Sequence, residues 1–380
     1  METAATHEER YSTMGNTLYM SMELSEAKWL LMFTVGAGQQ PREKTIRGSD
    51  RAALERELAR ARQRFGLAPD SRVVSCYEAG REGFWLHRYL RSLGVESLVV
   101  DSSSIAVNRR RRRAKTDRLD AKQLLIKLLR YDAGEHKEWS VVRVPTVADE
   151  AARQPSRELR TLKTERTRSR NRIKGLLAAQ GIRLHQLGGL AQRLDELQLW
   201  DGTALAPELK AQLRREHERL EHVERQIVAV EGERRQRLRQ VTDTVSAQVH
   251  KLQRLRAIGP NSAWTFSTEL FAWRQFRNRR QVGGIVGLTG TPYDSGQRPH
   301  EQGISKAGNP AVRAMSIEIA WGWLRHQPHS ALSQWYQARF GHGSSRLRRI
   351  GIVALARKLL IALWRYLEFD QLPAGAELKV

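Results

Sequence analysis

The sequence predicts an α/β domain at the N-terminal end, a helical middle segment and a mainly α C-terminal domain. Residues 21–145 alternate between β-prone runs and amphipathic helical runs. Over residues 146–250 almost no β signal remains, and Arg, Glu, Gln and Leu dominate. Residues 251–380 hold six of the ten tryptophans and several glycine-rich breaks. A chain of 380 residues is long enough for this division, at roughly 100–200 residues per domain.

The predicted α/β domain opens with two or three adjacent strands, because residues 22–24 and 27–35 are β-prone and residues 45–47 follow a Gly/Pro turn. The next elements, in order, are a helix capped by Ser49 or Asp50, a strand over 72–77, a helix containing 84–90, a strand over 97–100 and a helix from about Asp117. Meandering strands followed by right-handed crossovers are typical of an RNase H-like sheet. We therefore predict an RNase H-like fold for residues 21–145.

The first twenty residues contain no apolar run of the kind found in a signal peptide, and we expect them to form a disordered extension. No apolar stretch reaches the roughly 18 residues that a membrane span needs. The single cysteine, Cys76, excludes an intrachain disulfide and a cysteine-based zinc cluster. We expect a cytoplasmic protein with no membrane partner.

The middle segment carries apolar residues at steps of three and four, with gaps at Arg234 and Arg237. These apolar residues are Leu213, Leu220, Val223, Ile227, Val230, Val241 and Val245. The spacing predicts a helical hairpin or coiled coil. An oligomerising arm and a plain helical spacer both fit it. In the C-terminal domain we expect a glycine-rich loop at 287–309 and two long helices at about 310–326 and 346–367.

The charge balance indicates a polyanionic partner. Lys and Arg number 65 against 41 Asp and Glu, which gives a formal net charge of +24. Such a charge repels itself in a compact fold unless a polyanion neutralises it, and contacts with phosphates release condensed counterions. A basic ribosomal protein is an alternative, and a membrane-surface protein would need a basic amphipathic helix. Nucleic acid is the partner that we expect.

Four acidic residues are candidate metal ligands. Asp117 and Asp120 share one helix face, with Cβ atoms about 5–6 Å apart. Glu78 ends a predicted strand and Glu23 lies in the first one, so the predicted fold would bring all four carboxylates together. Clustered carboxylates persist where a divalent cation neutralises them, and Mg²⁺ (or Mn²⁺) prefers such oxygen ligands. Alternatively, the two aspartates merely favour the first turn of their helix and pair with a neighbouring arginine.

A run of six cations directly precedes the two aspartates. Its members are Arg109, Arg110, Arg111, Arg112, Arg113 and Lys115. We expect this run to grip a phosphate backbone and to deliver it to the carboxylates. A solvated charge run is the alternative.

Two glycine-rich segments, 287–296 and 303–309, would allow the close approach of a phosphate backbone. Ser295 lies near the end of the first segment and has the chemistry to attack a scissile phosphate. From residue chemistry alone, however, Asp-Ser-Gly is better explained as a common turn.

Taken together, these motifs resemble those of insertion-sequence transposases of the IS one-ten and IS eleven-eleven group, relatives of the Piv/MooV invertases. The resemblance rests on residues 77–80 and 115–121, and on 287–296 and 303–309 followed by Arg313. It covers about residues 20–130 and 250–345.

The resemblance implies a RuvC-like domain with a DEDD tetrad, a coiled-coil connector and a transposase domain with a catalytic serine. Glu78, Asp117 and Asp120 match the last three tetrad members, and Ser295 matches the nucleophile. Glu23 stands where the family usually has aspartate. The resemblance also implies a homo-oligomer (a dimer or tetramer) whose metal site and serine come from different subunits, and a structured non-coding guide RNA. Lys306 and Arg313 are further candidates for nucleic-acid contacts.

Three hypotheses follow. The first is a transposase that cleaves and rejoins DNA through a 5′-phosphoserine link at Ser295. The second is a RuvC-like, metal-dependent nuclease that uses water and forms no covalent intermediate. The third is a nucleic-acid-binding protein without catalysis. It stays open whether catalysis also involves Tyr293, Asp294, Ser305 or Lys306.

Overall fold

The structure is a computed structural model of the chain, and it describes residues 16–80, 82–105, 116–240, 243–295 and 298–379. The chain divides into two compact units, the N-terminal unit Met1–Pro145 and the C-terminal unit Thr146–Val380. Within the part of the chain that the structure describes, no helix is both long and apolar enough to cross a membrane.

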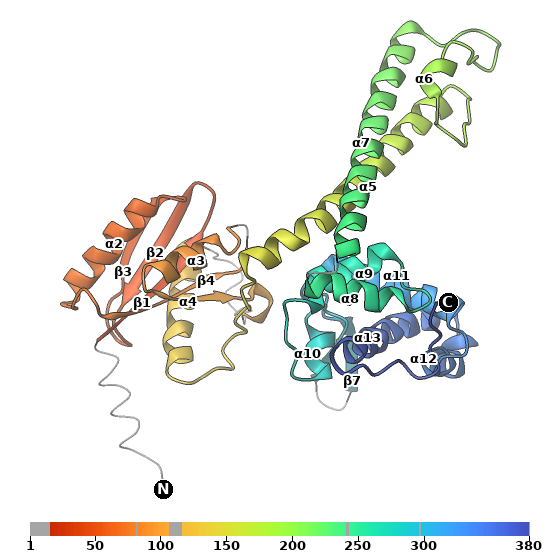
Figure 1. Cartoon of the computed structure of the whole chain (residues 1–380). Coiled ribbons are helices and arrows are strands. Elements are labelled where there is room, and N and C mark those ends of the chain that lie inside the picture. The colour runs from red at the N-terminus through yellow and green to blue at the C-terminus, as the bar shows by residue number, and fades with distance from the viewer. Residues whose placement is uncertain (1–15, 81, 106–115, 241–242, 296–297, 380) are drawn as a thin grey trace. The chain divides into compact units, whose positions relative to one another are not determined.

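A five-stranded mixed sheet forms the centre of the N-terminal unit (Figure 1). Its strands are β1 (Thr17–Leu24), β2 (Lys28–Thr34), β3 (Arg42–Arg47), β4 (Arg72–Glu78) and β5 (Glu96–Val100), in the spatial order β3-β2-β1-β4-β5. The first three strands form an antiparallel meander, whereas β4 and β5 run parallel to β1. The helices are α2 (Arg51–Arg64), α3 (Trp85–Ser92) and α4 (Asp117–Asp132), with a short 3₁₀ turn η1 (Ser102–Ser104) after β5. The expected order of strands and helices is confirmed.

Helices cover both faces of this sheet. On β1, the side chains of Leu18, Met20 and Met22 enter a core with residues of α2 and α3. The alternate residue Tyr19 enters a second core, which is formed with α4. Strand periodicity therefore divides β1 between two apolar layers.

The predicted boundary of the N-terminal extension was wrong. β1 begins at Thr17 rather than at residue 22, and residues 17–22 pair in register with residues 72–77. A strand that is covered on both faces shows no alternation of apolar and polar residues, so its start is hard to recognise in the sequence. The expectation of disorder for residues 1–15 lies outside the described residues.

The C-terminal unit begins with a helical hairpin, here called the helical arm. Its long helices are α5 (Val147–Ala178) and α7 (Pro207–Gln240), joined through the short α6 (Leu190–Arg193) (Figure 1). Lys163 pairs with Glu231 at 2.9 Å, and Arg172 pairs with Glu216 at 2.9 Å, so the two long helices lie side by side. The expected hairpin is confirmed, although Val245 lies beyond it on the next helix.

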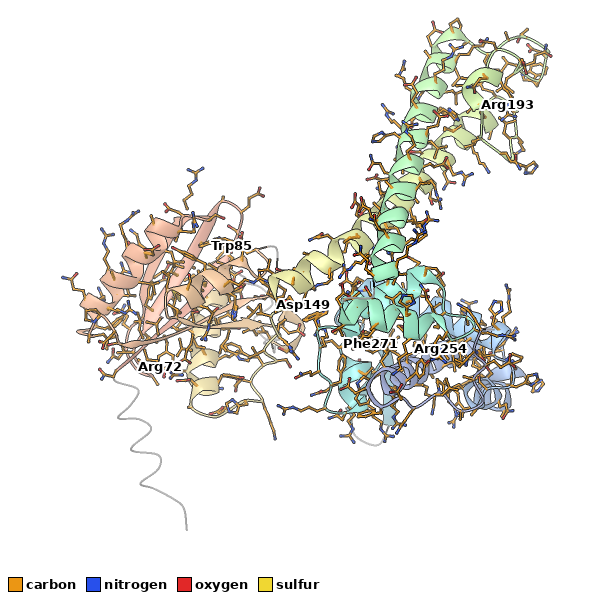
Figure 2. All side chains as sticks on the ribbon, viewed as in Figure 1. Arg72, Trp85, Asp149, Arg193, Arg254 and Phe271 are labelled. Atoms are coloured by element: carbon orange, nitrogen blue, oxygen red, sulfur yellow. The ribbon has the colours of Figure 1, made fainter. Side chains whose placement is uncertain are left out.

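The rest of this unit is a mainly helical body. Its elements are α8 (Thr244–Gln253), α9 (Pro260–Phe266), the π-helical turn η3 (Ser267–Phe271), α10 (Arg279–Gly284), β6 (Gly290–Ser295), β7 (Arg298–Ile304), α11 (Pro310–His326), α12 (Ala331–Tyr336), the π-helical turn η4 (Gln337–Gly341) and α13 (Ser345–Phe369). Aromatic side chains such as Trp264, Trp323 and Phe271 fill its core (Figure 2 labels Phe271). The two expected long helices are confirmed as α11 and α13.

The expected loop at 287–309 is wrong in part, since it contains the antiparallel hairpin β6–β7. Residues 290–304 lack the apolar alternation that predicts strands. The backbones of β6 and β7 pair from Gly290 to Ile304 all the same.

Candidate functional site

Glu23 and Glu78 lie at the same edge of the N-terminal sheet. β1 and β4 are parallel, and Met22 is the register partner of Tyr77. Glu23 and Glu78 are the next residues of these two neighbouring strands. Glu23 is half-buried and Glu78 is exposed. The structure therefore brings these two predicted ligands to adjacent strand ends.

Helix α4 runs antiparallel to β1 across one face of the sheet. Near its start, the carbonyl of Ala121 accepts a hydrogen bond from the Ser21 hydroxyl at 2.7 Å. At its end, Asp132 accepts one from the Tyr19 hydroxyl at 2.7 Å. The first turn of α4 thus lies toward the carboxyl end of β1, where Glu23 stands.

The first turn of α4 contains both predicted aspartates. The Thr116 side chain caps the helix by accepting a hydrogen bond from the Leu119 amide, so that the helix begins at Asp117. Asp117 and Asp120 favour this position because the amino end of a helix carries partial positive charge. Glu23, Glu78, Asp117 and Asp120, named here the carboxylate edge, therefore face one end of the sheet.

The carboxylate edge does not form a closed metal site. Among the described residues, no group of three or more His, Cys, Asp or Glu side chains is arranged to hold a metal ion. Asp117 instead pairs with the ammonium of Lys28, the first residue of β2, at 3.0 Å. The carboxylates supply the oxygen atoms that Mg²⁺ prefers as ligands. In this structure, however, these side chains are not gathered closely enough to hold one ion.

The second predicted motif folds through backbone contacts that only glycine permits. A Cβ atom on Gly287 would lie 2.3 Å from the carbonyl oxygen of Ala307. A Cβ atom on Gly308 would lie 1.8 Å from the carbonyl oxygen of Ile285, and both glycines have positive φ. The signature segment, residues 303–309, is therefore packed directly against residues 285–289.

Arg313, predicted to contact nucleic acid, also holds this segment together. Its Nη1 atom donates to the carbonyls of Val286, Lys306 and Ala307 at 3.0, 2.9 and 3.1 Å. This geometry gives Arg313 a structural task, and its contact with nucleic acid stays a prediction. Lys306 is exposed and has a left-handed backbone, with φ of 57°.

Ser295 is the last residue of β6, and its backbone is paired with that of Arg298 at the end of the hairpin. The four carboxylates belong to the N-terminal unit and Ser295 to the C-terminal unit. The predicted basic run at 109–113, together with residue 115, lies outside the described residues.

Comparison with known proteins decides the family. A family model described as "Transposase IS116/IS110/IS902 family" matches residues 249–337. A putative transposase of Sinorhizobium fredii is 43% identical over 377 residues, covering 95% of this chain and 94% of the relative. The chain belongs to the IS116/IS110/IS902 transposase family. The resemblance inferred from the motifs is confirmed.

Other relatives of this transposase are more distant. A second putative transposase of Sinorhizobium fredii is 31% identical over 306 residues, which is 78% of this chain and 68% of the relative. The transposase for insertion sequence element IS1328 of Yersinia enterocolitica is 25% identical over 223 residues, covering 58% of this chain and 64% of the relative. The region matched by the family model includes the β6–β7 hairpin and the signature segment.

Sequence reasoning missed one acidic residue of the transposase. Glu269 lies in η3 and is buried against Arg157 of α5 and Asn309 of the signature segment. A single carboxylate inside the aromatic run at 264–273 was a usable signal, since isolated carboxylates are almost never buried without a partner.

Proposed function

We propose that this transposase cleaves and rejoins the DNA of its own insertion element, using the carboxylate edge and Ser295. One observation carries the proposal: Glu23 and Glu78 lie at the carboxyl ends of adjacent parallel strands, Glu23 one residue before the end of β1 and Glu78 at the end of β4, and the helix that brings Asp117 and Asp120 starts toward the same end. The strand order β3-β2-β1-β4-β5 and its pattern of directions support an RNase H-like, RuvC-like fold for the N-terminal unit.

Mg²⁺ (or Mn²⁺) is the proposed cofactor of the carboxylate edge. A bound divalent cation would neutralise the mutual repulsion of the carboxylates and polarise a scissile phosphate. Ligation by Asp117 requires that its oxygen leave Lys28, and the exposure of both side chains makes that exchange easy. Glu23 serves in place of aspartate, with one more methylene between backbone and carboxylate.

Ser295 is the proposed nucleophile. Its Oγ atom forms a bond to phosphorus while the bond from phosphorus to the 3′ oxygen breaks, which leaves a 5′-phosphoserine and a free 3′ hydroxyl. A carboxylate takes the serine proton and passes it to the leaving 3′ oxygen, and a second 3′ hydroxyl later attacks the phosphoserine, releases the serine and joins the strands. The family resemblance supports this role.

The proposed partners are DNA and a structured non-coding guide RNA, with the protein acting as a homo-oligomer. A net charge of +24 supports a polyanionic ligand, and the family resemblance supports the guide RNA. The family resemblance supports a dimer or tetramer in which the carboxylate edge of one subunit serves Ser295 of another.

The decisive experiment looks for the covalent link. The full chain is incubated with Mg²⁺, DNA carrying the sequences that flank its gene, and RNA transcribed from those flanks. We expect a denaturation-resistant protein–DNA adduct that is absent in Ser295→Ala and present in Ser345→Ala, an exposed serine control at the start of α13. An adduct that persists in Ser295→Ala would refute the serine assignment.

A metal-dependent nuclease is the second candidate, because the carboxylate edge alone has the residues for hydrolysis by water. It predicts that Ser295→Ala cuts the same DNA at an unchanged rate and that the wild type forms no adduct.

A further inference from the structure

Glu269 is a buried carboxylate that connects two helices of the C-terminal unit. Its side chain is 4% exposed and receives two hydrogen bonds from Arg157 of α5, at 2.7 and 3.0 Å. The side-chain amide of Asn309 donates to the same carboxylate at 3.1 Å. One acidic group therefore joins the helical arm to the last residue of the signature segment.

The foot of α5 is fixed around this ion pair. The guanidinium of Arg153 lies over the ring of Trp273, 4.5 Å from its centre, and burial lowers the pKa of Arg153. The hydroxyl of Ser156, the residue before Arg157, lies 3.4 Å from the hydroxyl of Thr268 in η3. Arg157 thus belongs to a docked helix face rather than to a freely moving surface.

Asn309 is equally constrained on its own side. Its side-chain oxygen Oδ1 accepts hydrogen bonds from the backbone amides of Ala311 and Val312, which caps helix α11. This cap leaves its amide group turned toward Glu269. Gly308, the residue before it, lies against the backbone of Ile285. The signature segment can therefore adjust little on its own, and a shift of Glu269 would move it.

We propose that the Arg157–Glu269–Asn309 network is a mechanical coupling, through which the position of the helical arm sets the position of the signature segment and of the β6–β7 hairpin, whose first strand ends in Ser295. A partly buried ion pair gives little net stability compared with apolar packing, so its value here lies in fixing the groups that it binds. The π-helical turn η3 agrees with this role, because such turns are frequent at functional sites. Glu269 is a positioning residue, and the coupling is independent of which group is the nucleophile.

A swap of donor and acceptor tests the link to Asn309. Asn309→Asp keeps the cap of α11 but turns an oxygen toward Glu269, and Glu269→Gln turns an amide toward Asn309. In Glu269→Gln/Asn309→Asp, a donor again meets an acceptor between these two side chains, although residue 269 keeps only one of its two hydrogen bonds from Arg157. We expect each single variant to lower the transposition frequency of a plasmid carrying the gene and its flanks about tenfold, and the double variant to recover to within about threefold of wild type. A double variant no more active than the weaker single variant would overturn the proposal.

Amide hydrogen exchange tests the link to the arm. Arg157→Gln should speed exchange at residues 303–309 about tenfold, while the amides of α13 keep their wild-type rates. Arg170→Gln, an exposed arginine farther along α5, is the matched control and should change neither region. Wild-type exchange at 303–309 in Arg157→Gln, or a uniform rise throughout the C-terminal unit, would show that the network does not couple the arm to this segment.

Discussion

The ammonium of Lys28 lies 3.0 Å from a carboxylate oxygen of Asp117, at the edge of the sheet where the other three candidate ligands lie. Both side chains are more than half exposed, at 59% and 56%, so the pair adds only about 0–1 kcal/mol to stability. Its position is more informative than its strength. A positive charge stands beside the carboxylate that we propose to bind Mg²⁺.

Removal of Lys28 should therefore favour the metal. In Lys28→Met we expect Mg²⁺ to bind about two- to fivefold more tightly, because a competing charge worth about 0.5–1 kcal/mol is gone. Calorimetric titration of the full chain with Mg²⁺ measures this change. Lys44→Met, an exposed lysine of β3, is the control and should bind as wild type does. Unchanged or weaker binding in Lys28→Met would show that Lys28 does not compete for the site.

Asp120→Asn should separate activity from stability. We expect transposition to fall by at least about a hundredfold, the effect of losing one charged group at a reacting centre. The free energy of unfolding should change by no more than about 1 kcal/mol, the usual contribution of a carboxylate in the first turn of a helix. Asp70→Asn, at an exposed loop position, should retain activity. Full activity in Asp120→Asn would instead favour a protein that binds nucleic acid without catalysis.

Gly308→Ala should disrupt the signature segment far more than Gly303→Ala. Both glycines have positive φ, at 75° and 85°, so both substitutions incur a backbone cost of about 1–2 kcal/mol. Only at Gly308 would the new methyl group also meet a carbonyl oxygen, at 1.8 Å, whereas Gly303 has open space. We expect about 3 kcal/mol or more for Gly308→Ala, measured by urea unfolding. Equal losses in the two variants would mean that the segment relaxes around the added methyl group.

Acid should destabilise the N-terminal unit through Arg72, which bridges Glu96 and Asp132 (Figure 2 labels Arg72). Burial alone would raise the pKa of Asp132, but hydrogen bonds from Arg72 and Tyr19 outweigh it, and the pKa is lowered. The hydrogen bond from Arg72 likewise lowers the pKa of Glu96. A carboxyl group whose pKa is lowered in the folded state stabilises the fold at pH values above its unfolded pKa of about 4. This contribution to stability is lost as the pH falls through the pKa of the folded state.

The free energy of unfolding of Arg72→Met should therefore be about 1 kcal/mol lower than that of wild type at neutral pH, a value reduced for the partial exposure of Arg72. On acidification this free energy should fall less in Arg72→Met than in wild type. The buried thiol of Cys76, the single cysteine of the chain, is a probe of this unit alone. Its reaction with dithiodipyridine, followed in urea between pH 3 and 7, reports the unfolding. Arg64→Met, which removes an exposed arginine at the end of α2, should follow the wild-type pH profile, and a parallel profile in Arg72→Met would contradict the assignment.

Local signals made much of the N-terminal unit predictable. Asp50 caps α2, as one of the two predicted caps, and α4 begins at Asp117 as predicted, because a capping side chain acts on amides only three residues away. The stretch from Arg72 to Glu78 is apolar and β-branched enough to mark β4 by itself. The start of β1 at Thr17 could not be recognised in this way, since it depends on pairing with β4, a strand more than fifty residues away.

The sequence was sufficient to predict the family, the excess of positive charge, the order of elements in the N-terminal unit and the residue types of the carboxylate edge, because motifs, charge and helical periodicity are local properties. The folded structure alone shows that Lys28 pairs with Asp117, and that the segment expected to be a loop contains a hairpin whose first strand ends in Ser295. It also decided that Arg157 meets Glu269 across 112 residues of chain. Such contacts depend on how helices and strands pack, and packing joins residues whose spacing in the chain carries no periodic signal.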